Sequence, residues 1–381
     1  MKRRALIGCA QCLALSGLLG PAASRAQGSW LAPPRFERPA IASDEGGLWA
    51  MMDREETRLR RSPFLLRDAT VQKYLQDMAC KLAGSHCADV RVYPVRTPFF
   101  NASMAPNGMM QVWTGLLLRV DNEAQLAAVI GHEIGHYLQR HTLERLRDIK
   151  TRSAFGTFFS MFGLVGLIGQ LAAIAGAFGF SRDQERQADE IGLALMRQAG
   201  YDTREAAKVW DNLRLELAAV HGGDPSQRNP LFATHPGSAE RSETLRTLSA
   251  GDTGGHVGEE EHRTALAGLQ AAMLDDEIRR GQTGETLVLL NRLIERQPGR
   301  ADLLHARGEA RRLRAASDDL DLALADFERA VSLGGEPAEV HRSLGYLHRS
   351  RDQGERAREA FARYIEKAPA APDAALIKSL L

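Results

Sequence analysis

Residues 132–136 read HEIGH, and this stretch decides which class of fold the chain can adopt. It lies in the segment 121–141, where apolar residues recur every three or four positions, which predicts a buried amphipathic helix. Histidines four positions apart lie on one face of a helix about one turn apart, so both imidazoles can reach one zinc ion at about 2.0 to 2.1 Å. The spacing therefore predicts that His132 and His136 are zinc ligands.

Glu133 stands beside the two histidines without being a ligand itself. A carboxylate in this place can take a proton from metal-bound water and pass it to a leaving amine, which predicts a catalytic general base. The motif also occurs by chance on solvated helix faces. Here the neighbours Val129, Ile130 and Ile134 predict burial, where an unpaired imidazole is costly. We therefore interpret the motif as a metal site.

A catalytic zinc site usually has three protein ligands and keeps a fourth position for water. The candidate for the third ligand lies in the stretch 181–189, SRDQERQAD, where Glu185 and Asp189 are again four positions apart. We expect Glu185 to bind the metal and Asp189 to accept a hydrogen bond from a ligand histidine, which fixes the histidine's tautomer. Without the upstream motif, this stretch would be interpreted equally well as a surface helix. His141 and His221 match no ligand spacing and are expected to be structural.

These helices, together with NASMAPNG at 101–108 and TGLL at 114–117, resemble the HtpX-like and CAAX-prenyl-protease-like zinc endopeptidases. The resemblance covers roughly residues 65–250. It implies an α+β, mostly helical, gluzincin-type metallopeptidase domain with a small β-sheet, placed at 27–250. It also implies one Zn²⁺ ion per subunit, bound by His132, His136 and Glu185, with Glu133 catalytic.

The resemblance also includes His235, which with the proline after it looks like a downstream His-Pro element of the family. This histidine could be a fourth ligand that shuts the site, or it could donate a hydrogen bond to the tetrahedral intermediate. Capping of a helix that begins near Ser238 is an equally open alternative. Our hypothesis is that His235 approaches the zinc ion.

Before the motif, the spacing of the apolar residues changes to about every second position, which predicts a small sheet with a turn at 106–108. The expected strands are 90–95, 99–104 and 110–113. An extended substrate can bind a protease by adding its backbone to a strand. We expect the strand that contains Gln111, Val112 and Trp113 to pair with the substrate in this way.

The N-terminus has the layout of a secretory signal peptide, since basic residues at 2–4 precede an uncharged, mostly apolar run. We place cleavage after Ala26, which makes 1–26 the signal peptide; an uncleaved anchor is the alternative. Cleavage leaves Cys80 and Cys87, an even pair in an exported protein, so we predict a disulfide between them. Two buried thiols are the other possibility.

The segment that begins at Ser153 and ends at Ser181 has 29 residues without a charge, a length sufficient for a membrane-spanning helix. However, Glu185 must meet the two histidines, so both ends of the segment must lie near one zinc ion. Each arm of a hairpin would reach only about 20 Å, less than the roughly 30 Å hydrocarbon layer. Our hypothesis is an apolar hairpin that covers the cleft and contacts a membrane peripherally; an ordinary core hairpin is the alternative.

Beyond residue 250 the composition changes. A Gly- and Glu-rich stretch at 251–262 predicts a linker, and 263–381 predicts an all-α tetratricopeptide repeat array of about three repeats. Three positions recur at a separation of 34, namely Ala323, Phe327 and Ala330 with Ala357, Phe361 and Tyr364. Such an array offers a concave surface for peptide or protein partners, although it could also be a purely structural cap.

Charge and hydropathy argue against two classes of function. A net charge of +1 provides no overall field that favours nucleic acid, so none is expected as a partner. A mean hydropathy of −0.28 argues against several membrane helices. The signal peptide and the absence of a series of membrane helices indicate an exported branch of the family, similar to the periplasmic beta-barrel assembly-enhancing proteases.

That resemblance implies a periplasmic zinc metalloendopeptidase in quality control and assembly of outer-membrane proteins. Its expected substrates are unfolded or stalled outer-membrane proteins, and the repeats would contact the outer-membrane barrel assembly machinery. The alternative is a chaperone or assembly factor that binds partners through its repeats and has latent protease activity. An intramembrane protease is disfavoured, because the apolar segment cannot span a membrane while both its ends lie near the zinc ion.

Overall fold

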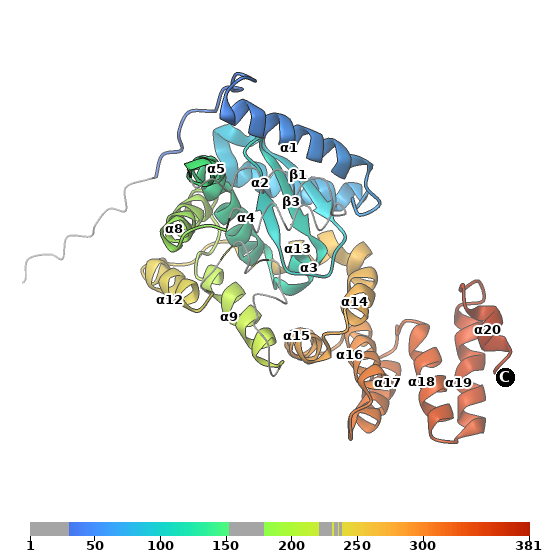
Figure 1. The fold of residues 1–381 in the computed structure, drawn as a ribbon. Helices are drawn as coiled ribbons and strands as arrows, with labels where there is room; N and C mark the ends of the chain where they lie inside the picture. The colour runs from blue at the N-terminus through green and yellow to red at the C-terminus, as the bar shows by residue number, and fades with distance from the viewer. Residues whose placement is uncertain (1–29, 152–178, 221–230, 232–234, 236–237) are drawn as a thin grey trace, which may run out of the picture. The chain divides into compact units, whose positions relative to one another are not determined.

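The computed structural model describes residues 30–151, 179–220, 231, 235 and 238–381 (Figure 1). The expected signal peptide, His221 and nearly all of the apolar segment 153–181 lie outside the described residues. Within the described part of the chain, none of the helices combines the length and the apolar character that a membrane span requires. The described residues are mostly helical, with one small sheet, as the sequence predicts.

Helical segments precede the sheet. The first two helices begin at side-chain caps, since Ser43 accepts a hydrogen bond from the N–H of Gly46 and Asp68 accepts one from the N–H of Val71. The first helix lies against the sheet, and the second packs on the strand β1 (Arg91–Val95) and on the helix α4 (Glu123–Leu138) (Figure 1). The segments are α1 (Asp44–Arg61), α2 (Ala69–Ala83) and the 3₁₀ helix η1 (Gly84–Asp89).

The sheet has three strands in the order β1-β3-β2. β1 runs parallel to β3, whereas β2 pairs with β3 in the antiparallel direction. Gly108 makes the turn between β2 and β3 at a φ of 85°, and a Cβ there would lie 2.0 Å from the carbonyl oxygen of Asp89. The strands are β1 (Arg91–Val95), β2 (Ala102–Met104) and β3 (Met109–Trp113).

The strand order overturns one sequence-based expectation. Gln111, Val112 and Trp113 lie in β3, which is the central strand and is hydrogen-bonded on both sides. These residues are also buried. A substrate backbone therefore has no free edge to pair with at β3, and the prediction of a substrate-pairing strand at 111–113 is wrong. The edge of the sheet on the side of α4 is formed by β2.

Two helices lie side by side in close contact (Figure 1). They approach at glycines: a Cβ on Gly192 would lie 3.0 Å from the backbone nitrogen of His132, and a Cβ on Gly135 would lie 3.0 Å from the carbonyl oxygen of Ala188. This close approach brings the side chains of the two helices to one point. The helices are α4 (Glu123–Leu138), capped by Asn122, and α8 (Arg182–Gln198), which begins with a capping box at Ser181.

Shorter helices surround this pair. α9 packs against α4, and α12 packs against both α8 and α9. α5 follows α4 after a turn at Arg140, whose φ of 58° lies in the left-handed region. These helices are α3 (Thr114–Arg119), α5 (His141–Thr151), α9 (Glu205–Ala218) and α12 (Ser238–Ser249).

The stretch 251–262, expected to be a linker, is bonded to the metallopeptidase helices. The N–H of His256 donates to the carbonyl of Gly200 at 2.8 Å, and the N–H of Glu123 donates to the carbonyl of Gly258 at 3.2 Å. α13 (Glu259–Leu266) begins inside this stretch, and its buried His262 lies 3.0 Å from the hydroxyl of Tyr74 in α2. The stretch is therefore a docked connection and not a free tether.

The C-terminal helices pack largely as successive pairs. Gly308 of α16 lies against the ring of Phe327 in α17, and Gly345 of α18 lies against the ring of Phe361 in α19. The recurrence at 34 residues thus corresponds to equivalent contacts, and the assignment to tetratricopeptide repeats stays a prediction. The helices are the 3₁₀ helix η3 (Ala267–Leu269), α14 (Gln270–Arg279), α15 (Thr283–Arg296), α16 (Ala301–Arg314), α17 (Asp319–Leu333), α18 (Glu339–Ser350), α19 (Gly354–Lys367) and α20 (Ala374–Lys378).

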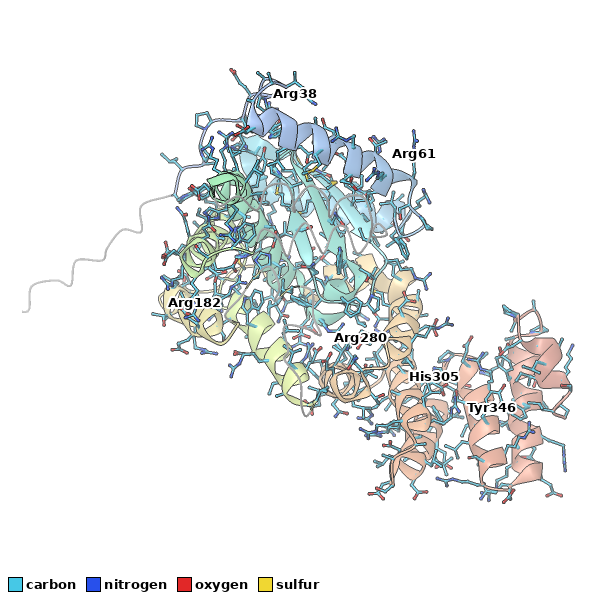
Figure 2. All side chains as sticks on the ribbon, viewed as in Figure 1. Arg38, Arg61, Arg182, Arg280, His305 and Tyr346 are labelled. Atoms are coloured by element: carbon cyan, nitrogen blue, oxygen red, sulfur yellow. A yellow bond between two sulfur atoms is a disulfide. The ribbon has the colours of Figure 1, made fainter. Side chains whose placement is uncertain are left out.

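A buried ionic cluster joins the metallopeptidase domain to the helices α14 and α15. The guanidinium of Arg119 in α3 donates to Glu216 of α9 at 2.7 Å and to Glu277 of α14 at 2.8 Å. All three side chains are buried. Arg280, labelled in Figure 2, also binds Glu277, at 2.8 Å, and Arg292 of α15 donates to the backbone carbonyl of Arg119. These contacts fix α14 and α15 to the domain.

Candidate metal centre

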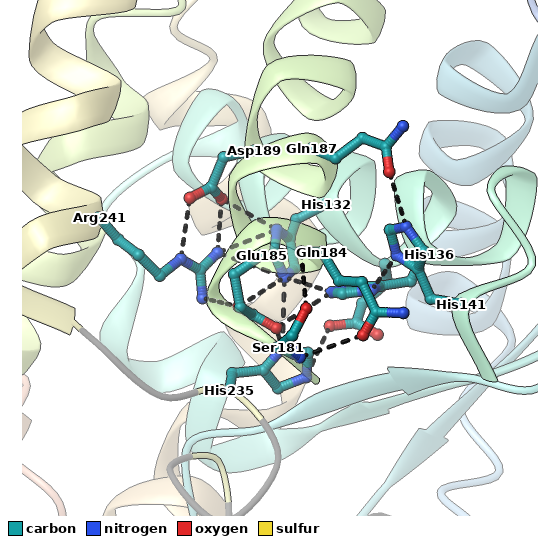
Figure 3. Close-up of polar contacts among 11 residues, drawn as sticks. His132, His136, His141, Ser181, Gln184, Glu185, Gln187, Asp189, His235 and Arg241 are labelled. Atoms are coloured by element: carbon teal, nitrogen blue, oxygen red, sulfur yellow. Dashed lines mark hydrogen bonds and ion pairs between the residues drawn. The ribbon is translucent and has the colours of Figure 1, made fainter. Parts of the chain in front are cut away.

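Four buried side chains from separate parts of the chain meet at one point (Figure 3). α4 supplies His132 and His136, α8 supplies Glu185, and His235 precedes α12. One ligand atom from each residue lies within 4.8 Å of all the others. The two histidine Nε2 atoms are 3.0 Å apart, and the Glu185 carboxylate lies 3.5 Å from His132 and 3.4 Å from His136. The structure therefore brings together the three predicted ligands and His235.

Asp189 fixes the tautomer of His132, as the spacing predicts. Its Oδ1 lies 2.9 Å from Nδ1 of His132, and a carboxylate only accepts, so Nδ1 carries the proton. Arg241 Nη2 is also 2.9 Å from this Nδ1, but the guanidinium makes a bidentate pair with Asp189, at 2.9 and 2.6 Å. Nε2 of His132 is consequently unprotonated and presents its lone pair to the cluster.

His141 fixes the tautomer of the second ligand in the same way, on the opposite side of the cluster (Figure 3). The amide oxygen of Gln187 lies 2.9 Å from Nε2 of His141 and accepts a hydrogen bond from its N–H, so Nδ1 of His141 is an acceptor. Nδ1 of His136, at 2.9 Å, donates to it. Nε2 of His136 is therefore also unprotonated and presents its lone pair to the cluster. His141 is not a ligand, as expected, but it positions one.

The arrangement favours a bound cation. Two lone pairs face each other at 3.0 Å inside a buried site, next to a carboxylate. Burial, followed by the effect of Arg241, lowers the pKa of His132 to about 4, and burial and His132 lower the pKa of His136, so both rings are neutral and able to bind metal. Imidazole nitrogens with one carboxylate oxygen form a typical zinc donor set. The residues fit Zn²⁺.

Glu133 lies beside the cluster and contributes no ligand atom to it. Its carboxylate accepts a hydrogen bond from the backbone of Met104 in β2. Only 3% of the residue is exposed, and burial raises the pKa of its carboxyl to about 7. A carboxylate that titrates near neutral pH suits a general base.

The His235 ring lies among the ligand atoms. Its Nδ1 is 2.9 Å from Glu185 Oε1 and 3.3 Å from His132 Nε2, and its Nε2 is 3.5 Å from Glu133. Burial on its own would lower the pKa of His235, but the carboxylates of Glu185 and Glu133 outweigh burial and raise it. Of the roles considered from the sequence, an approach to the metal fits these contacts.

Sequence reasoning missed Gln187 and two residues that contact the ligands directly. Arg241 of α12 is buried, with its guanidinium 3.8 Å from the ring centre of Trp210 and Nη1 3.1 Å from Glu185 Oε2. Burial on its own would raise the pKa of Glu185, but His235 and Arg241 hold it well below the usual range. The ring of Phe180 stacks on that of His136, with centres 3.8 Å apart. Neither residue belongs to a spacing pattern that could have revealed it.

The fold and the donor set define the class: this is a metallopeptidase domain with a zinc centre on the HEIGH helix. Residues 65–249 match the model of peptidase family M48, in agreement with the resemblance at 65–250. The chain therefore contains a peptidase family M48 domain.

Curated proteins with three different names are similar to this chain. The chain is 33% identical over 184 residues to mitochondrial metalloendopeptidase OMA1 of Arabidopsis thaliana, covering 48% of this chain and 36% of the relative. It is 30% identical over 245 residues to a beta-barrel assembly-enhancing protease of Yersinia pestis, covering 58% and 49%. It is 27% identical over 152 residues to metalloprotease YcaL of Escherichia coli, covering 38% and 57%. The chain thus spans between about a third and three-fifths of these relatives' lengths.

Proposed function

We propose that this protein is a zinc-dependent endopeptidase that hydrolyses peptide bonds at the centre formed by α4 and α8. The observation that carries the proposal is the pair of unprotonated Nε2 atoms, 3.0 Å apart, beside a non-ligand carboxylate. Zn²⁺ would be held by His132, His136 and Glu185, and would polarise the scissile carbonyl and lower the pKa of water when bound.

Glu133 performs the proton transfers in this proposal. With a pKa raised to about 7, its carboxylate can accept a proton from the attacking water and donate it to the leaving amine. The backbone N–H of Met104 holds the carboxylate in place during both steps. Because that N–H belongs to β2, the edge strand and the general base are fixed to each other.

β2 is the strand where an extended substrate would bind. It is the edge strand of the sheet on the side of α4. Its residues lie within the stretch 101–108, which resembles the family. A peptide added to this edge would gain backbone hydrogen bonds and pass next to Glu133. β2 thus takes the role that the sequence assigned to 111–113.

We propose that His235 is a fourth ligand that shuts the site in the resting protein. Its Nδ1 already lies within hydrogen-bonding distance of Glu185 and near His132 Nε2. A substrate carbonyl would need the position that this ring takes, so His235 must turn away during turnover, where it can donate to the tetrahedral intermediate. A zinc-to-His235 separation too large for a water bridge in every state of the protein would refute this role.

We further propose that the enzyme acts in the periplasm on unfolded or stalled outer-membrane proteins. The signal-peptide layout supports export, and the similarity to a protein named beta-barrel assembly-enhancing protease supports the substrate class. Partner binding to the barrel assembly machinery through the C-terminal helices, and peripheral membrane contact through 153–181, belong to the same proposal. The similarity to mitochondrial OMA1 proteins favours only the metallopeptidase chemistry.

The Glu133→Gln variant tests the proposal. The amide cannot accept the proton, so cleavage of an unfolded outer-membrane protein should fall at least about a hundredfold while bound zinc stays unchanged. Unchanged cleavage would refute the mechanism. Full complementation of a deletion strain by this variant would favour the alternative function, a chaperone or assembly factor with latent protease activity.

A further inference from the structure

A disulfide joins Cys80 near the end of α2 to Cys87 in η1 and closes a short loop. His86 lies inside this loop, and Asp89 lies at the end of η1, just beyond it. Both side chains face residues 33–36 of the chain, which form part of the segment before α1. We refer to residues 32–43 as the arm.

The disulfide loop holds the arm at two points. The ring of His86 is fully buried, and its Nε2 donates to the backbone carbonyl of Pro33 at 2.9 Å. The carboxylate of Asp89 accepts two hydrogen bonds from the guanidinium of Arg35, at 2.7 and 2.6 Å. A bidentate pair of this kind fixes orientation as well as distance. The arm is therefore fixed just before Phe36.

Phe36 carries the contact from the arm to the end of the metal-binding helix. Its ring packs edge-on against Tyr137, with centres 5.2 Å apart, and Tyr137 directly follows the ligand His136. The guanidinium carbon of Arg140 lies 5.1 Å from the centre of the same ring. Phe36 also lines a small cavity together with Met104 and His136. The arm thus touches the C-terminal turn of α4 from outside.

This turn connects the ligand to the residue that positions it. Arg140 makes the left-handed turn between α4 and α5. The next residue is His141, which accepts a hydrogen bond from Nδ1 of His136. Arg140 is also ion-paired with Glu45 at the start of α1. Contacts therefore run without a gap from the disulfide loop, through the arm, to the His136–His141 pair.

We propose that the arm is a strap that holds the His136 end of the metal centre, and that the Cys80–Cys87 disulfide is its redox-sensitive anchor. A dithiol breaks the S–S bond by giving two electrons and two protons, which leaves two thiols here and one new disulfide in the dithiol. Reduction frees the loop, releases Pro33 and Arg35, and weakens metal binding at His136. The inference rests on the zinc centre of the proposed function but not on its substrates.

The test compares the full zinc-loaded chain with its Cys80→Ser, Cys87→Ser double variant, which avoids a reductant that would itself bind zinc. The first readout is trypsin cleavage of the Arg35–Phe36 bond, followed by mass spectrometry; the Arg38–Pro39 bond is resistant because proline follows. Its rate should rise roughly tenfold or more in the double variant, because the strap opens more often. The second readout is zinc affinity by competition with a chromogenic chelator, which should fall roughly tenfold.

Three further variants complete the test. Lys73→Ala removes an exposed ion pair on the same helix, α2, and should change neither readout. Phe36→Ala keeps the disulfide and should reproduce the loss of zinc affinity, which decides the question even if the double variant folds poorly. Arm release without weaker zinc binding, or no change in either readout, would overturn the proposal. Glu133→Gln should keep both readouts at wild-type values, so failure of the catalytic mechanism is distinguishable.

Discussion

Nδ1 of His141 lies 2.9 Å from Nδ1 of His136, so a residue that binds no metal fixes the tautomer of a ligand. Gln187 accepts a hydrogen bond from Nε2 of His141 at 2.9 Å. We refer to these two hydrogen bonds, from His136 to His141 and from His141 to Gln187, as the relay. The relay runs from α8 through the start of α5 to α4, and it ends at the lone pair that faces the zinc position. Partners of this kind typically contribute a factor of about 10 to 100 to metal affinity.

Replacement of His141 by Leu should therefore lower zinc affinity by roughly 10- to 100-fold, because Nδ1 of His136 loses its buried acceptor and the ring loses its fixed orientation. Competition with a chelator at pH 7 measures this directly. Gln187→Leu should give a smaller loss in the same direction. His256→Leu, at a side chain that is 42% exposed, is the control. Wild-type affinity in the His141 variant would contradict the relay.

Replacement of Gly192 by Ala should separate the two ligand-bearing helices. The new Cβ would lie 3.0 Å from the backbone nitrogen of His132, so α8 must shift and take Glu185 away from the histidines. We expect a destabilisation of about 1 to 3 kcal/mol together with weaker zinc binding. Gly251→Ala meets no atom within 4 Å and serves as the matched control. Equal zinc affinity and equal urea midpoints for both variants would show that the close approach is not required.

Removal of the Arg119 charge should lower the free energy of unfolding of the protein. Arg119→Met leaves Glu216 and Glu277 buried without their shared partner, which typically costs about 3 to 5 kcal/mol. Urea unfolding gives the free-energy change. Arg279→Met removes an exposed pair with Asp275 and should cost less than about 1 kcal/mol. Similar losses in both variants would mean that the buried cluster contributes no more than a surface pair.

His262 should make the stability of the chain depend on pH. Burial lowers the pKa of His262 to about 4 from its ordinary value of 6.5, so between these two values the unfolded chain binds more protons than the folded chain. Stability from this group is present above pH 6.5 and is lost as the pH falls through 4, by at most about 3 kcal/mol.

The variant His262→Gln isolates this contribution from other groups that titrate in acid. Its free energy of unfolding should decrease less than that of the wild type between pH 7 and pH 4.5, as measured by urea unfolding at both values. His256→Gln should follow the wild type. A wild-type pH dependence in the His262 variant would exclude this histidine as the cause.

The metal ligands could be predicted from the sequence because their information is local. His132 and His136 share one helix at a fixed spacing, and Glu185 with Asp189 repeats that spacing on a second helix. The Cys80–Cys87 pair also lies within a short stretch, and the structure contains the disulfide.

Features that depend on how distant elements meet could not be predicted. Period-two spacing locates strands but not their order, so it predicts substrate pairing at 111–113 and does not reveal that β3 pairs with β1 on one side and with β2 on the other. Arg241 acts only because α12 packs against α8, and a lone arginine in a helix gives no sign of that. Residues 251–262 have a linker-like composition, yet backbone hydrogen bonds hold them on the domain.

β2 has only three residues, from Ala102 to Met104. An edge this short can engage only a few backbone groups of a bound chain and offers little surface for recognising side chains. If the clients are those of the proposed function, binding would then depend on whether a segment is free to extend, which a strand paired within a finished barrel is not and an unpaired strand is. The enzyme would in that case select its clients by their folding state and not by their sequence.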